Sequence, residues 1–155
     1  MKDSLAPDEP STCAYARMLV RLHDLIAKGQ GDGPEADAVR DRMDAPWYAL
    51  TGAEQERVGG LSEDLYALAE QIPRSVPMAA EERGRWGQEF KAALDAGDWD
   101  RALVLLRRPP ADVPAEHVAF FQADCWDHLG CPEVALRFMR AATRLDPAEA
   151  VSALT

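Results

Sequence analysis

Apolar side chains recur at three- and four-residue steps along much of the chain, which is the spacing of an amphipathic helix. The clearest stripe lies within residues 11–28 and consists of Tyr15, Met18, Leu19, Leu22, Leu25 and Ile26. A glycine-rich run over residues 29–33 follows it. This run lacks the preceding strand and the following Lys-Ser or Lys-Thr of a phosphate-binding loop. We therefore expect a helix that ends in a hairpin turn.

A second helix is predicted to begin within residues 32–35, with Asp32 as its capping residue and Pro34 in its first turn. Pro46 should end this helix, because a proline ring clashes with the carbonyl group one turn earlier. Trp47 and Tyr48 would then follow the helix rather than belong to it.

A third helix is predicted from Thr51 and Glu54, which have the spacing of a capping box. Its apolar stripe consists of Val58, Leu61, Leu65 and Leu68. Two consecutive glycines, residues 59–60, lie inside the stripe, and each weakens a helix by about 1 kcal/mol relative to alanine. We expect a kink there or a new start at Ser62, followed by a proline-containing connector over residues 73–79.

From about residue 80 the chain repeats itself. The segment W-G-Q-E-F-K-A-A-L-D-A-G-D-W-D-R-A-L-V-L-L is followed by F-F-Q-A-D-C-W-D-H-L-G-C-P-E-V-A-L-R-F-M. Four pairs of identical residues share an offset of 33, and they are Gly97 and Gly130, Ala102 and Ala135, Leu103 and Leu136, and Pro114 and Pro147. A fixed period in this range indicates stacked helical hairpins.

These residues resemble the tetratricopeptide-repeat family, whose unit is a pair of antiparallel helices, over residues 83–148. The matching residues of the second copy are Ala123, Trp126, Gly130, Ala135, Met139, Ala142 and the ending L-D-P at residues 145–147. Those of the first copy are Trp86, Phe90, Gly97, Asp98, Trp99, Ala102, Leu106 and Pro114. The first copy departs from the pattern at Pro109, which should shorten its second helix. Asp98 and Asp146 should cap the helices that follow them.

The expected fold is therefore all-α, with about seven helices whose antiparallel hairpins stack as a short, right-handed solenoid like that of the tetratricopeptide repeats. Residues 1–10 would be a flexible tail. Residues 11–72 would form a divergent helical hairpin plus an extra helix, as an irregular N-terminal cap. Residues 80–155 would form the two repeats with a short end cap over 147–155. About three hairpins are needed for a continuous core, so these parts should make one compact unit.

The charge of the chain narrows the classes of partner. The net charge is −10 and the pI is about 4.7. Nucleic acids and anionic membrane surfaces attract basic proteins, so neither is expected as a partner. The three cysteines do not have the pattern of a disulfide framework, and the first residues lack the apolar run of a signal peptide. These features favour a cytoplasmic location.

Cys125, His128 and Cys131 have a spacing that suggests zinc. Structural zinc takes four ligands in a tetrahedron, whereas three-residue steps on a helix spread these side chains over roughly 120°. Cys125 and His128 alone would suggest a thiol nucleophile, but Asp124 and Asp127 should raise the pKa of that thiol and so weaken it. The repeat assigns the same stretch to a helix end and a turn. We therefore expect no catalysis, metal or cofactor here, and a thiol enzyme or metal protein is the minor alternative.

The resemblance implies a partner groove lined by the first helix of each hairpin. The matching positions are Lys91, Leu94 and Asp95 in the first copy and His117, Phe120, Asp124, Asp127 and His128 in the second. Some family members clamp a terminal carboxylate with Lys and Asn side chains, and here only Lys91 could do so. The other positions include acidic residues and the aromatic residue Phe120. They therefore suit a basic and partly apolar segment. Trp47 and Tyr48 are a candidate second surface or a seal between helices.

We therefore expect a non-enzymatic protein–protein interaction module, such as an adaptor, scaffold or assembly subunit, that binds a peptide segment of another protein along this groove. The alternative is a small acidic chaperone that holds one client protein, as some short repeat proteins do in bacterial secretion.

Overall fold

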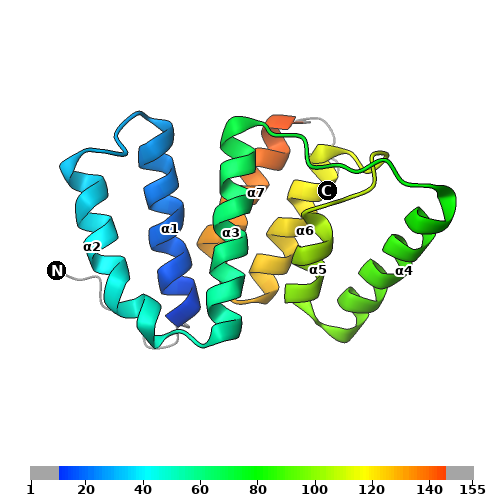
Figure 1. Ribbon diagram of the computed structural model, residues 1–155, viewed down its shortest axis with the longest axis horizontal. Coiled ribbons are helices and arrows are strands. Elements are labelled where there is room, and N and C mark those ends of the chain that lie inside the picture. The colour runs from blue at the N-terminus through cyan, green and yellow to red at the C-terminus, as the bar shows by residue number, and fades with distance from the viewer. Residues whose placement is uncertain (1–10, 146–155) are drawn as a thin grey trace. The chain divides into compact units, whose positions relative to one another are not determined.

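The computed structural model describes residues 11–145, and this part of the chain consists of seven helices without a strand (Figure 1). The all-α prediction is therefore confirmed. The chain divides into two compact units, one ending at Gln71 and the other beginning at Ile72, next to the predicted connector. The predicted tail over residues 1–10, the Asp146 cap and the end cap over residues 147–155 lie outside the described residues.

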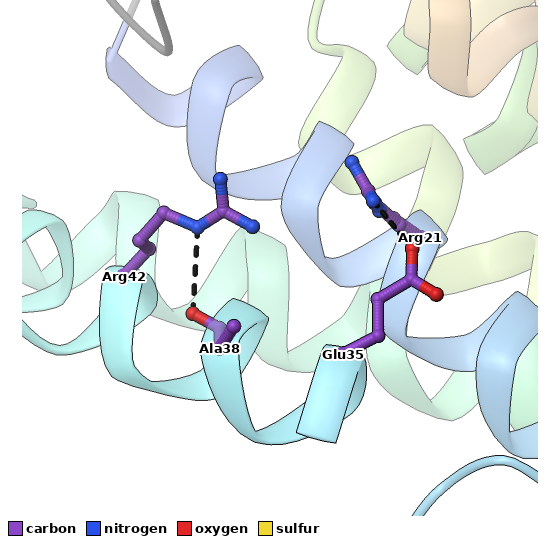
Figure 2. A network of polar contacts seen from close by, with 4 residues as sticks. All are labelled: Arg21, Glu35, Ala38 and Arg42. Carbon is purple, nitrogen blue, oxygen red and sulfur yellow. Dashed lines mark hydrogen bonds and ion pairs between the residues drawn. The ribbon is translucent and has the colours of Figure 1, made fainter. Parts of the chain in front are cut away.

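The first unit contains α1 (Ser11–Ala27), α2 (Pro34–Ala49) and α3 (Gly52–Glu70). Helix α1 lies between α2 and α3 and packs against both (Figure 1). The apolar stripes predicted from the sequence are buried in part. Leu19 and Leu25 on α1, Val39 and Met43 on α2, and Val58, Leu61 and Leu65 on α3 are buried. Tyr15, Met18, Leu22 and Leu68 are half-buried, and Ile26 is exposed. Arg21 of α1 also forms an ion pair of 2.6 Å with Glu35 in the first turn of α2 (Figure 2).

Helix α2 differs from its prediction at both ends. Its N-cap is Gly33, which has no side chain, so the prediction that Asp32 caps this helix is wrong. The helix also continues through Pro46 to Ala49. Pro46 has no N–H group to donate to the carbonyl group four residues earlier, but only three residues of α2 follow it. The last turn is also tied to its surroundings, since the carbonyl oxygen of Trp47 accepts hydrogen bonds from Leu50 N at 3.1 Å and from the Gln55 side chain at 3.1 Å.

Helix α3 is continuous from Gly52 to Glu70, so of the two alternatives predicted at the glycines, a kink or a new start at Ser62, the new start is wrong. Its start confirms the capping box, because Glu54 N donates to Thr51 Oγ1 at 3.1 Å and Thr51 N donates to Glu54 Oε1 at 3.0 Å. The buried stripe on its inner face offsets the weak helix propensity of the two glycines. Packing of one face is what holds most helices together, so glycines are tolerated inside them.

The carboxylate of Glu54 also bonds to another helix. The hydroxyl group of Thr12, which is buried on α1, donates to Glu54 Oε2. This hydrogen bond, and next the backbone amide of Thr51, lower the pKa of Glu54 below the ordinary value for glutamate. A single carboxylate thus joins the start of α3 to the first turn of α1.

The second unit contains α4 (Ala80–Ala96), α5 (Trp99–Leu106), α6 (Ala115–His128) and α7 (Pro132–Leu145). Helices α4 and α5 form one hairpin, α6 and α7 form another, and α5 packs against α6. Helix α5 is short and ends before Pro109, as predicted. The connector bonds to the loop that follows α5, since Val76 N donates to Pro109 O at 2.8 Å and Ala111 N donates to Val76 O at 3.1 Å.

Helices α1, α4 and α6 end in the same backbone turn. Gly29, Gly97 and Gly130 have positive φ angles of 77°, 69° and 83°. Each glycine N–H donates to the carbonyl group three residues earlier, and the next N–H donates to the one five residues earlier. These bonds define the Schellman motif. The predicted turns are therefore present in both hairpins of the second unit, and α1 ends in the same way.

The repeat offset of 33 holds for some buried positions and fails for others. Ala102 and Ala135 are both buried. Leu103 is buried as well, whereas its counterpart Leu136 is 49% exposed. Asp98 caps α5 by accepting a hydrogen bond from Arg101 N at 3.1 Å, as predicted. The offset thus relates turns and small residues, while the burial of Leu103 and Leu136 differs between the two hairpins.

The hydrogen bond between Thr12 and Glu54 predicts a pH-dependent stability. A carboxyl group with a lowered pKa stabilises the fold above its unfolded pKa, and that contribution disappears as the pH falls through the folded value. Thr12→Val removes the hydroxyl donor at nearly constant shape. We expect it to lower the free energy of unfolding by about 1 kcal/mol at pH 7 and by much less at pH 3, measured by urea unfolding.

Thr143→Val is the matched control, because this exposed hydroxyl group bonds only to the carbonyl oxygen of Met139 in its own helix. Its effect should be small and independent of pH. A destabilisation by Thr12→Val that stays the same from pH 7 to pH 3 would contradict a role through the Glu54 carboxylate.

Two glycine substitutions should change stability in opposite directions. A Cβ atom added at Gly59, an exposed position inside α3, meets no described atom within 4 Å, so Gly59→Ala should stabilise the protein by about 0.5–1 kcal/mol. Gly97 has equal space but a φ of 69°, so Gly97→Ala should destabilise it by about 1 kcal/mol. Urea unfolding followed by circular dichroism measures both changes. Shifts of the same sign would contradict this account.

Candidate functional site

Helix α6 carries five of the eight predicted groove residues. Its buried face consists of Ala119, Gln122, Ala123, Cys125 and Trp126. Asp127 and His128 are exposed, while His117, Phe120 and Asp124 are half-buried. The helix begins after Pro114 and ends at His128, just before the Gly130 turn. The end of α6 therefore presents two carboxylates and an imidazole next to one another.

His128 is fixed by contacts with two helices. Its ring stacks on the indole ring of Trp99 at the start of α5, with centroids 4.1 Å apart and planes at 23°. Its Nδ1 atom lies 2.8 Å from the carbonyl oxygen of Asp124 and 3.5 Å from Asp124 Oδ1. A carbonyl oxygen only accepts, so Nδ1 carries a hydrogen atom in this bond. In neutral His128 the Nε2 atom is then an acceptor.

Four aromatic rings form a continuous series between α4 and α6. Trp86 stacks on Phe90 at 5.0 Å, Phe90 meets Phe121 edge to face at 5.2 Å, and Phe121 meets Phe120 at 6.0 Å. Phe90 is buried and the other three are half-buried. The indole N–H of Trp86 donates to Leu105 O on α5 at 3.0 Å. This aromatic series positions α4 against the second hairpin and leaves part of Phe120 in solvent.

The three predicted groove residues of α4 differ in exposure. Lys91 and Asp95 are exposed and form an ion pair of 3.1 Å with each other, and Leu94 is half-buried. Arg101 of α5 likewise forms an ion pair of 3.0 Å with Glu89 of α4. Lys91 and Arg101 are thus each already paired with a carboxylate.

The structure brings some of the predicted residues together and separates others. Asp124 contacts His128, and Lys91 contacts Asp95. His117 lies in the first turn of α6, eleven residues before His128, which is roughly 16 Å along the helix axis. The eight residues therefore form clusters along two helices and not one compact site.

Sequence reasoning missed two residues that shape these clusters, namely Trp99 and Phe121. In the sequence Trp99 belongs to the glycine turn of the first copy, and Phe121 lies next to the predicted groove residue Phe120. The signal that the sequence offers for both residues is an aromatic side chain close to predicted groove positions. Their contacts depend on how α5 and α4 pack against α6, and this packing is not encoded by spacing within one helix.

Cys125 is fully buried, and burial is the main reason why the pKa of its thiol is raised to about 12. The carboxylates of Asp124 and Asp100 add to this rise, whereas the sequence suggested Asp124 and Asp127. A buried thiol with such a pKa carries almost no thiolate at neutral pH and makes a poor nucleophile.

The geometry of the predicted zinc candidates also differs from that of a metal site. Cys125 and Cys131 are buried, whereas the side chain of His128 is 47% exposed. Within residues 11–145 no three His, Cys, Asp or Glu side chains are grouped as metal ligands.

Trp47 and Tyr48, the candidate second surface, differ in their surroundings. Trp47 is half-buried, and its ring centroid lies 5.6 Å from that of Tyr15 on α1. Tyr48 is 83% exposed. Burial, and next the charge of Asp44, raise the pKa of Tyr15. Trp47 thus seals α2 against α1, and Tyr48 projects into solvent.

The raised pKa of Cys125 predicts slow alkylation. A rise from 9.0 to about 12 lowers the thiolate fraction at pH 8 roughly a thousandfold, so iodoacetamide should label Cys125 in the folded protein at least a hundredfold more slowly than in urea. Mass spectrometry of the peptide that contains Cys125 measures the rate. Asp100→Asn should increase it modestly, because burial is the larger cause. Equal rates in folded and unfolded protein would contradict the assignment.

No helix in residues 11–145 is both long and apolar enough to cross a membrane. Comparison of the whole chain with protein-family models, with curated proteins and with solved structures finds no match.

Proposed function

We propose that this chain is a protein–protein interaction module, an adaptor or assembly subunit, whose second unit binds a basic and partly apolar segment of another protein. The observation that carries this proposal is the exposed surface of α6, where Asp124 and Asp127 lie on the same helix as the half-exposed Phe120. Carboxylates attract a cationic segment, and an aromatic ring accepts an apolar side chain beside it.

The charges around α6 support a basic partner. Asp98 and Asp100 begin α5, and Trp99 between them stacks on His128. The cations Lys91 and Arg101 are each held by a carboxylate of this unit and do not compensate these acids. With a net charge of −10, the whole chain also attracts cationic segments over long range at low salt.

Within the all-α class, we propose that the second unit is a short solenoid like that of the tetratricopeptide repeats. Two observations support it. Both hairpins turn at a left-handed glycine, Gly97 or Gly130, and both bury a small residue, Ala102 or Ala135, near the start of the second helix. Small residues allow two helices to approach closely, which is how such hairpins pack.

Peptide binding tests the proposed function. Fluorescence anisotropy would compare a labelled peptide that carries Arg and Lys among Leu and Phe with a peptide in which Glu replaces the basic residues. We expect only the basic peptide to bind, and more weakly as salt is added. Asp124→Lys with Asp127→Lys should weaken binding about tenfold, because two attractive charge pairs become repulsive.

Asp32→Lys with Asp41→Lys is the matched control, since it makes the same charge change at two exposed positions of the first unit. It should change affinity only slightly. Equal binding of the acidic and basic peptides, or equal losses in the two double variants, would contradict the proposed surface. A client that binds only when unfolded would instead indicate the chaperone alternative.

A further inference from the structure

We propose that Trp99, His128 and Asp124 form a recognition site for an arginine side chain of the partner segment and select arginine over lysine. This inference rests on the proposed function, because it specifies which basic side chain the surface of α6 binds. The three residues come from two helices that pack together, α5 and α6.

The exposed chemistry of the site consists of hydrogen-bond acceptors and ring surface. The Nδ1–H group of His128 is engaged by the backbone carbonyl of Asp124 at 2.8 Å, which leaves Nε2 as an acceptor in the neutral ring. The Asp124 side chain is 44% exposed, so its carboxylate accepts further hydrogen bonds from outside. The ring of His128, which stacks on Trp99 with centroids 4.1 Å apart and is 47% exposed, supplies aromatic surface beside these acceptors.

A guanidinium group fits this combination better than an ammonium group does. It is planar, it carries five N–H donors and no acceptor, and it stacks on aromatic planes while its fork bonds a carboxylate. It also loses hydration more easily than an ammonium group, which is a compact and strongly hydrated charge. An arginine can therefore bond Asp124 and His128 Nε2 while lying along the ring stack, whereas a lysine gains mainly the charge attraction.

The neighbouring charges favour a cation at this position. Asp127 lies on the last turn of α6, and Asp98 and Asp100 flank Trp99. Asp100 is close enough to Cys125 for its charge to raise the pKa of that thiol, which places this carboxylate near α6. A ligand that is itself anionic would meet carboxylates and acceptor atoms and would be repelled.

The test uses the full chain and three labelled peptides that are identical except for one cationic position, which carries arginine, lysine or the neutral analogue citrulline. Fluorescence anisotropy measures the affinities. The arginine peptide should bind about threefold to fivefold more tightly than the lysine peptide. In His128→Ala and Trp99→Leu this ratio should fall to about one, while lysine binding changes less than twofold. Tyr48→Leu, which removes an exposed aromatic ring from the first unit, should leave the ratio unchanged.

The outcomes separate this inference from the proposed function. Tight but equal binding of the arginine and lysine peptides would overturn the arginine site and leave the proposed function in place. An arginine preference that persists in both His128→Ala and Trp99→Leu would assign the selectivity to other residues. Absence of binding by every basic peptide would overturn both proposals. His128 is exposed at a helix end, so His128→Ala remains informative if Trp99→Leu fails to fold, as circular dichroism would show.

Discussion

The left-handed turn that follows a helix is the constraint on which the rest of this structure depends. At Gly29, Gly97 and Gly130 a positive φ angle ends one helix and reverses the chain, so that the next helix runs back along it. An L-residue with a side chain is strained in this conformation by about 1–2 kcal/mol, whereas glycine is not. Because both hairpins of the second unit close in this way, Asp98 and Trp99 begin α5, and His128 is the last residue of α6.

The candidate site depends on these turns and on the burial beneath them. Cys125 and Trp126 are buried on the inner face of α6, and this packing orients Asp124, Asp127 and His128 outward. The thiol that suggested chemistry in the sequence is a core group, while the imidazole that accompanied it lies on the surface and stacks on Trp99. The chemistry of the surface is therefore that of hydrogen-bond acceptors, carboxylates and rings, which are the groups that recognise a cationic segment.

Local signals predicted much of the fold. The capping box of Thr51 and Glu54 and the cap at Asp98 are present because each needs only residues three positions apart. The errors share one physical cause. Helix α2 continues through Pro46, and α3 does not restart at Ser62, because packing outweighs a local preference of about 1–3 kcal/mol. Helix α2 likewise begins after Gly33 without help from Asp32, since Pro34 is already suited to a first turn.

By itself the sequence determined the helical class, the apolar stripes, the glycine turns and the acidic character of the exposed positions. These follow from periodicity, backbone preference and charge, all of which act between residues near one another in the chain. Only the tertiary structure decided that Trp99 meets His128, that Phe121 joins the aromatic series of α4, and that Thr12 bonds to Glu54. Such contacts join residues on different helices, and the packing of whole helices determines which side chains meet.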